Sequence, residues 1–186
     1  MNTDSIREYI DKNFSQKRKE HTEGVVKTAI ELARIYGEDE EKAEIAALFH
    51  DMFRGSSESV LNYYVKHLNL DPKYIDNCNL AHGKIASVIM ERDYGIKDKD
   101  IINAVSYHTT GRAGMSKLEK IIYIADAIEP GRNYPGVLEL RKLAYENLDK
   151  ACEESLKHTI EFVESKGQYL DIDTLLARDY LEKRRK

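Results

Sequence analysis

Apolar residues recur along this chain at intervals of three and four positions, which is the spacing of one face of an α-helix. Residues 16–36, for example, place Val25, Ala29 and Leu32 on one face, and Gly37 follows as a helix stop. We find no stretch with the alternating apolar and polar pattern of a half-buried strand. The sequence therefore predicts an all-α protein.

Capping residues and helix breakers divide this pattern into successive helices. The predicted ranges are 4–14, 16–36, 40–53, 57–68, a short helix from 72, 80–94, 99–108, 117–128, 138–143, 146–165, and a last helix capped by Asp173 and Thr174. The chain has 186 residues, of which 41% are hydrophobic and 33% are charged. This size and composition are typical of one folded domain, which we expect to span residues 1–186.

The most apolar of these helices, residues 40–53, carries His50 and Asp51 near its end. Residues 43–49 are apolar at every position except Glu44, which indicates burial in the core. A carboxylate at the end of a buried run costs several kcal/mol unless it is paired, hydrogen-bonded or coordinated. We therefore interpret His50 and Asp51 as the nucleus of a metal site.

Three more histidines and a second aspartate have similar positions on other helices. His21, His82 and His108 each lie on the apolar face of their own helix, and Asp126 lies beside the apolar face of helix 117–128. Any one of these groups alone would be explained by a hydrogen bond to the backbone. Together they make six polar groups on five helices, which a divalent ion would satisfy jointly because imidazole and carboxylate are suitable ligands.

The remaining histidines and the cysteines do not extend this pattern. His67 and His158 are offset from the apolar faces of their helices, so we do not expect them to bind a metal. Cys78 and Cys152 are too few for a disulfide framework and too isolated for a zinc knuckle.

Charge and hydropathy exclude some classes of partner. The net charge of −4 argues against broad nucleic-acid binding, and the basic residues 183–186 are expected to form a solvated end. The apolar runs are too short to span a membrane. The opening residues lack the basic and apolar regions of a secretory signal, so we expect a cytoplasmic protein.

Several segments around these residues form a larger motif set. They are Ala46-Ala47-Leu48-Phe49-His50-Asp51, Ala81-His82-Gly83, Tyr107-His108-Thr109-Thr110-Gly111-Arg112, residues 115–126, Ile128-Glu129-Pro130-Gly131-Arg132, Pro135-Gly136-Val137, residues 167–170 and residues 173–175. In these segments the chain resembles the YqeK family of HD-domain proteins over nearly its whole length. The resemblance implies an HD-domain helical bundle with a metal site in its core, in which the C-terminal helices complete the nucleotide site.

Members of this family are bacterial enzymes that hydrolyse diadenosine tetraphosphate symmetrically to two ADP, with iron at the metal site. The resemblance thus implies a symmetrical bis(5'-nucleosyl)-tetraphosphatase in which a metal-bound hydroxide attacks a phosphoanhydride. It assigns one metal to His21, His50, Asp51 and Asp126. It places His82 and His108 where related sites hold a second metal or contact a phosphate oxygen.

We expect Asp51, His82 and His108 to be catalytic residues, with Asp51 orienting the attacking water or accepting its proton. Phosphoanhydride hydrolysis needs charge stabilisation more than a protein nucleophile, and the sequence shows no convincing nucleophile with a base. Mixed His/Asp sites accept iron, manganese, cobalt or zinc. Iron follows from the resemblance alone, and both one and two ions fit the pattern.

A tetraphosphate is highly anionic, so cations must gather near the metal. The expected substrate contacts are Arg18, His21, Arg54, His82, Lys84, His108, Thr109, Thr110, Gly111, Arg112, Arg132, Gln168 and Tyr169. Lys117 is a weaker candidate, Tyr134 is a candidate for stacking on a base, and an ordinary solvated charge is the alternative for each cation. Arg54 stands where the family usually has lysine, which bears on substrate preference more than on reaction class.

Two alternatives stay open at this point. A related enzyme could keep the metal site and act as a nucleoside monophosphatase or phosphodiesterase. A nucleotide-sensing module could use the metal structurally, without catalysis. The expected partner is a dinucleoside polyphosphate or a nucleotide, with ADP as product and GDP as an alternative, and no nucleic acid or membrane; a homodimer is one assembly that the sequence allows.

Overall fold

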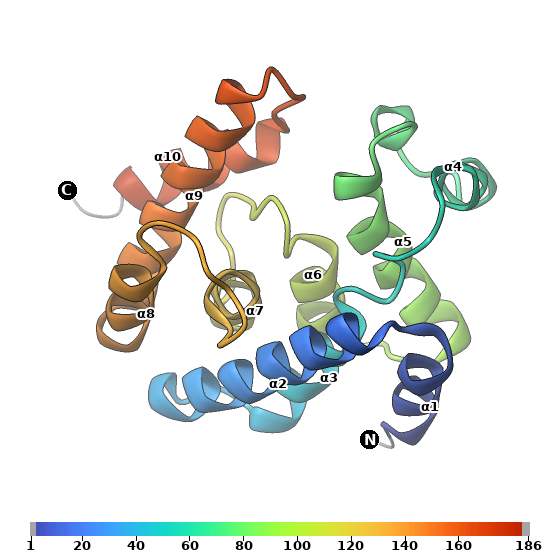
Figure 1. Cartoon of the computed structure of the whole chain (residues 1–186), viewed down its shortest axis with the longest axis horizontal. Helices are drawn as coiled ribbons and strands as arrows, with labels where there is room; N and C mark the ends of the chain where they lie inside the picture. Colours follow the sequence, from blue (N-terminus) through green and yellow to red (C-terminus); the bar gives the residue numbers. More distant parts are fainter. Residues whose placement is uncertain (1–2, 184–186) are drawn as a thin grey trace.

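The computed structural model describes residues 3–183, which form ten α-helices and one short 3-10 helix, with no strand in that range (Figure 1). The helices are α1 (Asp4–Asn13), α2 (Gln16–Tyr36), α3 (Glu40–Phe49), α4 (Glu58–His67), η1 (Pro72–Tyr74), α5 (Cys78–Asp93), α6 (Lys99–Ser106), α7 (Lys117–Ile128), α8 (Val137–Glu146), α9 (Leu148–Ser165) and α10 (Ile172–Lys183). The prediction of an all-α protein is confirmed. Arg184, Arg185 and Lys186 of the expected basic end lie outside the described residues.

The core forms where α2, α3, α6 and α7 pack on one another. Leu32, Leu48, Leu118 and Ile122 are each no more than 1% exposed there. Burial of each such side chain contributes about 1.5–3 kcal/mol relative to exposure. The elements that carry the candidate metal ligands are therefore held rigidly against one another.

The last two helices, α9 and α10, lie beside this core and are called the C-terminal bank below. In Figure 1, α9 and α10 lie across a gap from α4 and α5, while α9 packs on α7, α8 and α10. Lys73 in η1 forms an ion pair with Asp171 at the start of α10, with 2.8 Å between the ammonium nitrogen and the carboxylate oxygen. This ion pair joins the C-terminal bank to the segment between α4 and α5.

Several predicted helix ends differ from the structure by one to four residues, and three of them concern residues of the site. The helix predicted over 40–53 ends at Phe49, because after the last i→i+4 bond, from the His50 N–H to the Ala46 carbonyl, the chain tightens into i→i+3 turns. Likewise α6 ends at Ser106, so His108 follows that helix instead of belonging to it. The last helix begins at Ile172, and its cap is Asp171, whose carboxylate accepts the N–H of Asp173.

None of the helices in residues 3–183 combines the length and the apolar character needed to cross a lipid bilayer.

Replacing the cap of α7 should lower the stability of the protein without altering the candidate metal ligands. The Ser116 hydroxyl accepts the N–H of Glu119 at 3.1 Å, while the Glu119 side chain pairs with Arg112. Ser116→Ala should lower the free energy of unfolding by about 1 kcal/mol in urea titration, because one helix-end N–H loses its partner. Ser116→Asp keeps an acceptor and should restore most of the loss. Equal urea midpoints for wild type and Ser116→Ala would contradict this account.

Candidate metal centre

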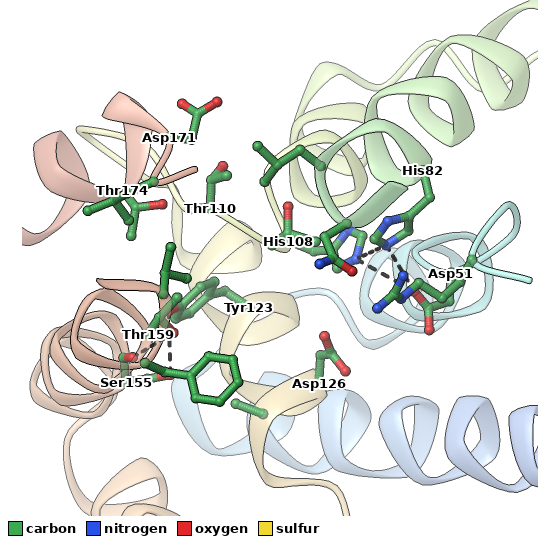
Figure 2. A pocket seen from close by; sticks show the side chains of 18 of the residues that line it. Asp51, His82, His108, Thr110, Tyr123, Asp126, Ser155, Thr159, Asp171 and Thr174 are labelled. Carbon is green, nitrogen blue, oxygen red and sulfur yellow. Dashed lines mark hydrogen bonds and ion pairs between the residues drawn. The ribbon is translucent and has the colours of Figure 1, made fainter. Parts of the chain in front are cut away.

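Four histidines from four separate segments meet in the core. His21 comes from α2, His50 follows α3, His82 comes from α5 and His108 follows α6. The Nε2 atoms of His21 and His50 are 3.4 Å apart, and those of His82 and His108 are 3.0 Å apart. Figure 2 shows His82 and His108 pointing toward Asp51, with Asp126 nearby. The structure thus brings together residues separated by up to 105 positions in the sequence.

Backbone hydrogen bonds fix how three of these rings carry their protons. The Nδ1–H groups of His50, His82 and His108 donate to the carbonyls of Ala47, Cys78 and Val105, at 2.6, 3.1 and 2.8 Å respectively. This arrangement assigns the proton to Nδ1 and leaves the Nε2 lone pairs facing one another. Lone pairs this close repel unless a cation lies among them. The donor set therefore fits a divalent metal ion.

Asp51 is shared by both histidine pairs. Its Oδ1 atom is 3.1 Å from the His82 Nε2 atom, and its Oδ2 atom is 3.5 Å from the Nε2 atoms of both His21 and His50. Burial raises the pKa of this carboxyl, but His50, His21 and His82 together lower it well below its usual range. The carboxylate is therefore ionised at neutral pH. Two overlapping groups could hold an ion, one with His21 and His50 and the other with His82 and His108.

Glu129 is a member of the site that the sequence analysis did not assign. The His21 Nδ1–H group donates to a Glu129 carboxylate oxygen at 3.1 Å, while the His21 Nε2 atom is 3.2 Å from an Asp126 oxygen. Glu129 is 3% exposed and also accepts the N–H of Gly131. A carboxylate behind a histidine fixes the ring and makes it a better metal ligand. The one sequence signal for Glu129 was its place in the motif 128–132.

Two glycines make room for this arrangement. A Cβ atom on Gly24 would lie 2.6 Å from the Glu129 carboxylate, and a Cβ atom on Gly83 would lie 2.9 Å from the ring of His108. Both distances are shorter than side-chain atoms allow. The helices α2 and α5 can therefore approach the site closely only because these positions have no side chain.

Two arginines stand at the edge of the centre. Arg18 pairs with Asp51, and Arg132 pairs with Asp126. The two guanidinium side chains are 33% and 39% exposed, whereas that of Asp51 is 6% exposed. Each arginine thus contacts a carboxylate of the centre on one side, buried for Asp51 and partly exposed for Asp126, and remains accessible to a ligand on the other.

A cavity of about 460 Å³ extends from the metal centre to the C-terminal bank (Figure 2). The expected contact residues that line it are Arg18, Arg54, His82, His108, Thr109, Thr110, Arg132 and Tyr169. Its other walls include residues that the sequence analysis did not expect to contact the substrate: Tyr123, Ser155, Thr159, Phe162, Asp171 and Thr174. Asp171 directly precedes α10, and the others come from α7, α9 and α10. Serine, threonine and aromatic residues are common on amphipathic helices, so no distinctive sequence signal marks them.

Some of the expected contact residues do not line this cavity. Arg112 donates two hydrogen bonds to the Glu119 carboxylate, and the Lys84 ammonium lies 3.4 Å from the centre of the Tyr107 ring. Burial lowers the pKa of Lys84 to about 8. Lys117 donates to the Tyr36 carbonyl at 2.8 Å, at the end of α2. Gly111 and Gln168 are also absent from the cavity wall.

His67 and His158 lie away from the centre. The His67 ring stacks on Tyr63 in α4, with 5.3 Å between ring centres. His158 lines a different cavity beside α9. Among the described residues, neither belongs to a group that could hold an ion.

Comparison with known proteins identifies the family and the relatives that this chain resembles. The HD domain family model matches residues 18–131. Over 182 residues the chain is 40% identical to the symmetrical bis(5'-nucleosyl)-tetraphosphatase of Bacillus subtilis, covering 97% of this chain and 98% of that protein. The protein of the same name from Staphylococcus aureus is 38% identical over 166 residues, covering 88% and 86% of the two chains.

A solved structure agrees with this similarity. It is described as a predicted HD superfamily hydrolase involved in NAD metabolism from Clostridium acetobutylicum. The sequences are 45% identical, the TM-score is 0.93, and the match covers 99% of this chain and 98% of the other.

Loss of the Glu129 charge should weaken metal binding. Glu129→Gln keeps the shape of the side chain but removes the negative charge behind His21, so the dissociation constant for Mn²⁺ should rise about 10- to 100-fold. Competition with a chelator of known affinity measures this change. The matched control is Glu139→Gln, which alters an exposed carboxylate on α8. Unchanged Mn²⁺ affinity in Glu129→Gln would mean that Glu129 has no role in the centre.

Metal affinity should also rise with pH. Burial lowers the pKa of His21, but hydrogen bonds to Asp126, Asp51 and Glu129 outweigh it and raise this pKa to about 9. Below about pH 9, an incoming ion must displace a proton from His21, so binding weakens as the pH falls. This one group should change the apparent Mn²⁺ affinity by up to about tenfold per pH unit between pH 7 and 9. Chelator competition at several pH values tests it, and an affinity constant across this range would contradict it.

Proposed function

Because this chain belongs to the YqeK family of HD-domain proteins, we propose that it is a metal-dependent hydrolase that cleaves diadenosine tetraphosphate symmetrically to two ADP. The observation that carries this proposal is the junction of a buried His/Asp centre with a cavity that has arginines at its mouth. A purely structural metal site would need neither an adjoining cavity nor accessible cations. The same cavity reaches the C-terminal helices, which supports their expected role in completing the nucleotide site.

The first ion is held by His21, His50, Asp51 and Asp126 in this proposal. A divalent ion supplies a hydroxide at neutral pH and neutralises negative charge on phosphate oxygens. Iron is the ion we propose, and manganese, cobalt and zinc suit the same ligands.

A second ion held by Asp51, His82 and His108 fits the neighbouring group. Burial, together with the charges of His82 and His50, lowers the pKa of His108 to about 3. A neutral imidazole offers a lone pair to a metal, whereas a phosphate contact would favour the protonated ring. Of the two expected roles for His82 and His108, this difference favours metal binding.

Asp51 binds the metal ions in this mechanism. Its pKa lies well below the usual range, so its carboxylate is a weak base. We therefore assign Asp51 to binding the ions and orienting water, in preference to accepting the proton of that water.

The arginines bind the phosphate chain. Arg18 and Arg132 have exposed guanidinium faces beside the centre and can each offer paired N–H donors to phosphate oxygens. Arg54, Thr109 and Thr110 continue the cavity wall, and Tyr169 and Phe162 are exposed aromatic residues on this wall that can contact a base. A guanine substrate giving GDP, a homodimer and cytoplasmic location stay as predictions from the sequence.

Product analysis tests the proposal directly. The protein supplied with Fe²⁺ or Mn²⁺ should convert diadenosine tetraphosphate to ADP alone, as measured by ion-exchange chromatography. Formation of ATP and AMP, or turnover only of nucleoside monophosphates or cyclic nucleotides from a panel, would contradict it. No turnover of any nucleotide despite bound metal would favour the nucleotide-sensing alternative.

A metal-ligand variant provides the mechanistic control. Asp126→Ala should lower kcat/KM by more than the roughly 100-fold that loss of an outer-sphere partner can cause, because a direct ligand is removed. Circular dichroism should show that the variant keeps its helices. His67→Ala, far from the centre on α4, should retain wild-type activity.

A further inference from the structure

Symmetrical cleavage places a demand on the shape of the site. The scissile bond lies at the middle of the tetraphosphate, so an identical nucleoside diphosphate extends from each side of the metal centre. The cavity of about 460 Å³ leads from the centre to α9 and α10 in one direction. The other half of the substrate requires a path in another direction.

A second cavity, of about 710 Å³, lies between the start of α2 and the loop 129–134. Arg18 and Arg132 line both cavities. The metal-centre residue His21 lines the second cavity, while Asp51 and Asp126 line the first. Because the His21 Nε2 atom is only 3.2 Å from the Asp126 carboxylate, the two cavities lie on either side of the same centre.

We propose that this second cavity binds the second nucleoside diphosphate half of the substrate, an inference that rests on the proposed function. Arg18 and Arg132 would then contact the phosphates nearest the cleaved bond from both sides. Each half of the tetraphosphate would have its own subsite, and each of the two ADP products would form in one of these subsites.

The second cavity has the chemistry that a nucleoside diphosphate needs. Lys17, in the first turn of α2, adds an exposed ammonium group to the two shared arginines. Tyr134 offers an aromatic ring whose hydroxyl donates to the Ala127 carbonyl at 2.9 Å, which fixes the ring at the cavity wall. The buried carboxylate in this wall, Glu129, is already bonded to His21 and to the Gly131 N–H.

A third cavity, of about 850 Å³, is the competing location. It lies beside α9 and is lined by Tyr134, His158 and Phe162, among others. Among the residues that line it, none belongs to the groups that could hold an ion, and Arg132 is its one lysine or arginine. A diphosphate leaving the centre would meet fewer cations there, so the second cavity is the better site.

Counting bound product separates these locations. By equilibrium dialysis with radiolabelled ADP, the metal-loaded wild-type protein should bind two ADP per chain. Lys17→Ala should weaken one of the two sites about three- to tenfold, as expected for an exposed charged contact to phosphate. Lys19→Ala removes an equal charge from a lysine that pairs with Asp11 and lines none of the three cavities, so both sites should be unchanged. One ADP per wild-type chain would overturn the proposal, as would weakening by His158→Ala and not by Lys17→Ala.

Kinetics give an independent measurement. Lys17→Ala should raise KM for diadenosine tetraphosphate about three- to tenfold with kcat nearly unchanged, because the contact is made equally before and during cleavage. Tyr134→Ala should raise KM about tenfold through lost stacking, while Tyr134→Phe should stay near wild type. If wild type forms ADP and these KM values do not change, the subsite is wrong and the proposed function stands. If wild type forms no ADP, the proposed function fails, and the ADP count still decides the subsite.

Discussion

The buried carboxylate of Asp51 determines the arrangement of the elements around it. A single carboxylate in a helical core is costly unless positive charge or hydrogen-bond donors surround it. Here four histidine rings and Arg18 face it from α2, α5 and the turns after α3 and α6. Packing of these elements and electrostatics of the site therefore depend on each other: the helices must approach closely for the charges to be satisfied. A divalent ion completes this balance because the Nε2 lone pairs converge on the same space.

Outside the buried centre, the protein uses longer side chains that reach from partly exposed positions. Arg18 and Arg132 each pair with a carboxylate of the centre and line the cavities on both sides of it. The C-terminal bank, tied to η1 through the Lys73–Asp171 ion pair, supplies a wall of serine, threonine and aromatic side chains. A rigid metal centre is thus combined with a surround that is polar, cationic and open to solvent, which suits a long anionic substrate.

The sequence predicted the helices and the meeting of the histidines from the apolar periodicity, which places His21 and His82 on the inner faces of α2 and α5. His50 and His108 lie in turns just beyond α3 and α6, where the apolar spacing continues after the helix has ended. It did not predict that α3 ends at Phe49, since the apolar spacing continues into turns that are not helical. Arg112 and Lys84 were expected at the substrate, but their directions depend on Glu119 and Tyr107, which tertiary packing brings close. Glu129 lies 108 residues from His21, and no local pattern marks such a pair.

Gly24 extends the requirements of the metal centre to a position that supplies no ligand. Because Gly24 has no side chain, the Glu129 carboxylate can lie directly against α2 at this position. The backbone of Gly24 is helical, so glycine is needed here because a side chain would not fit, and not because of an unusual backbone conformation. A designer who grafted the histidines and aspartates onto another helical bundle would copy every coordinating atom and still lose the support of His21. Such a graft would need glycine at the position of Gly24 as well as the ligands themselves.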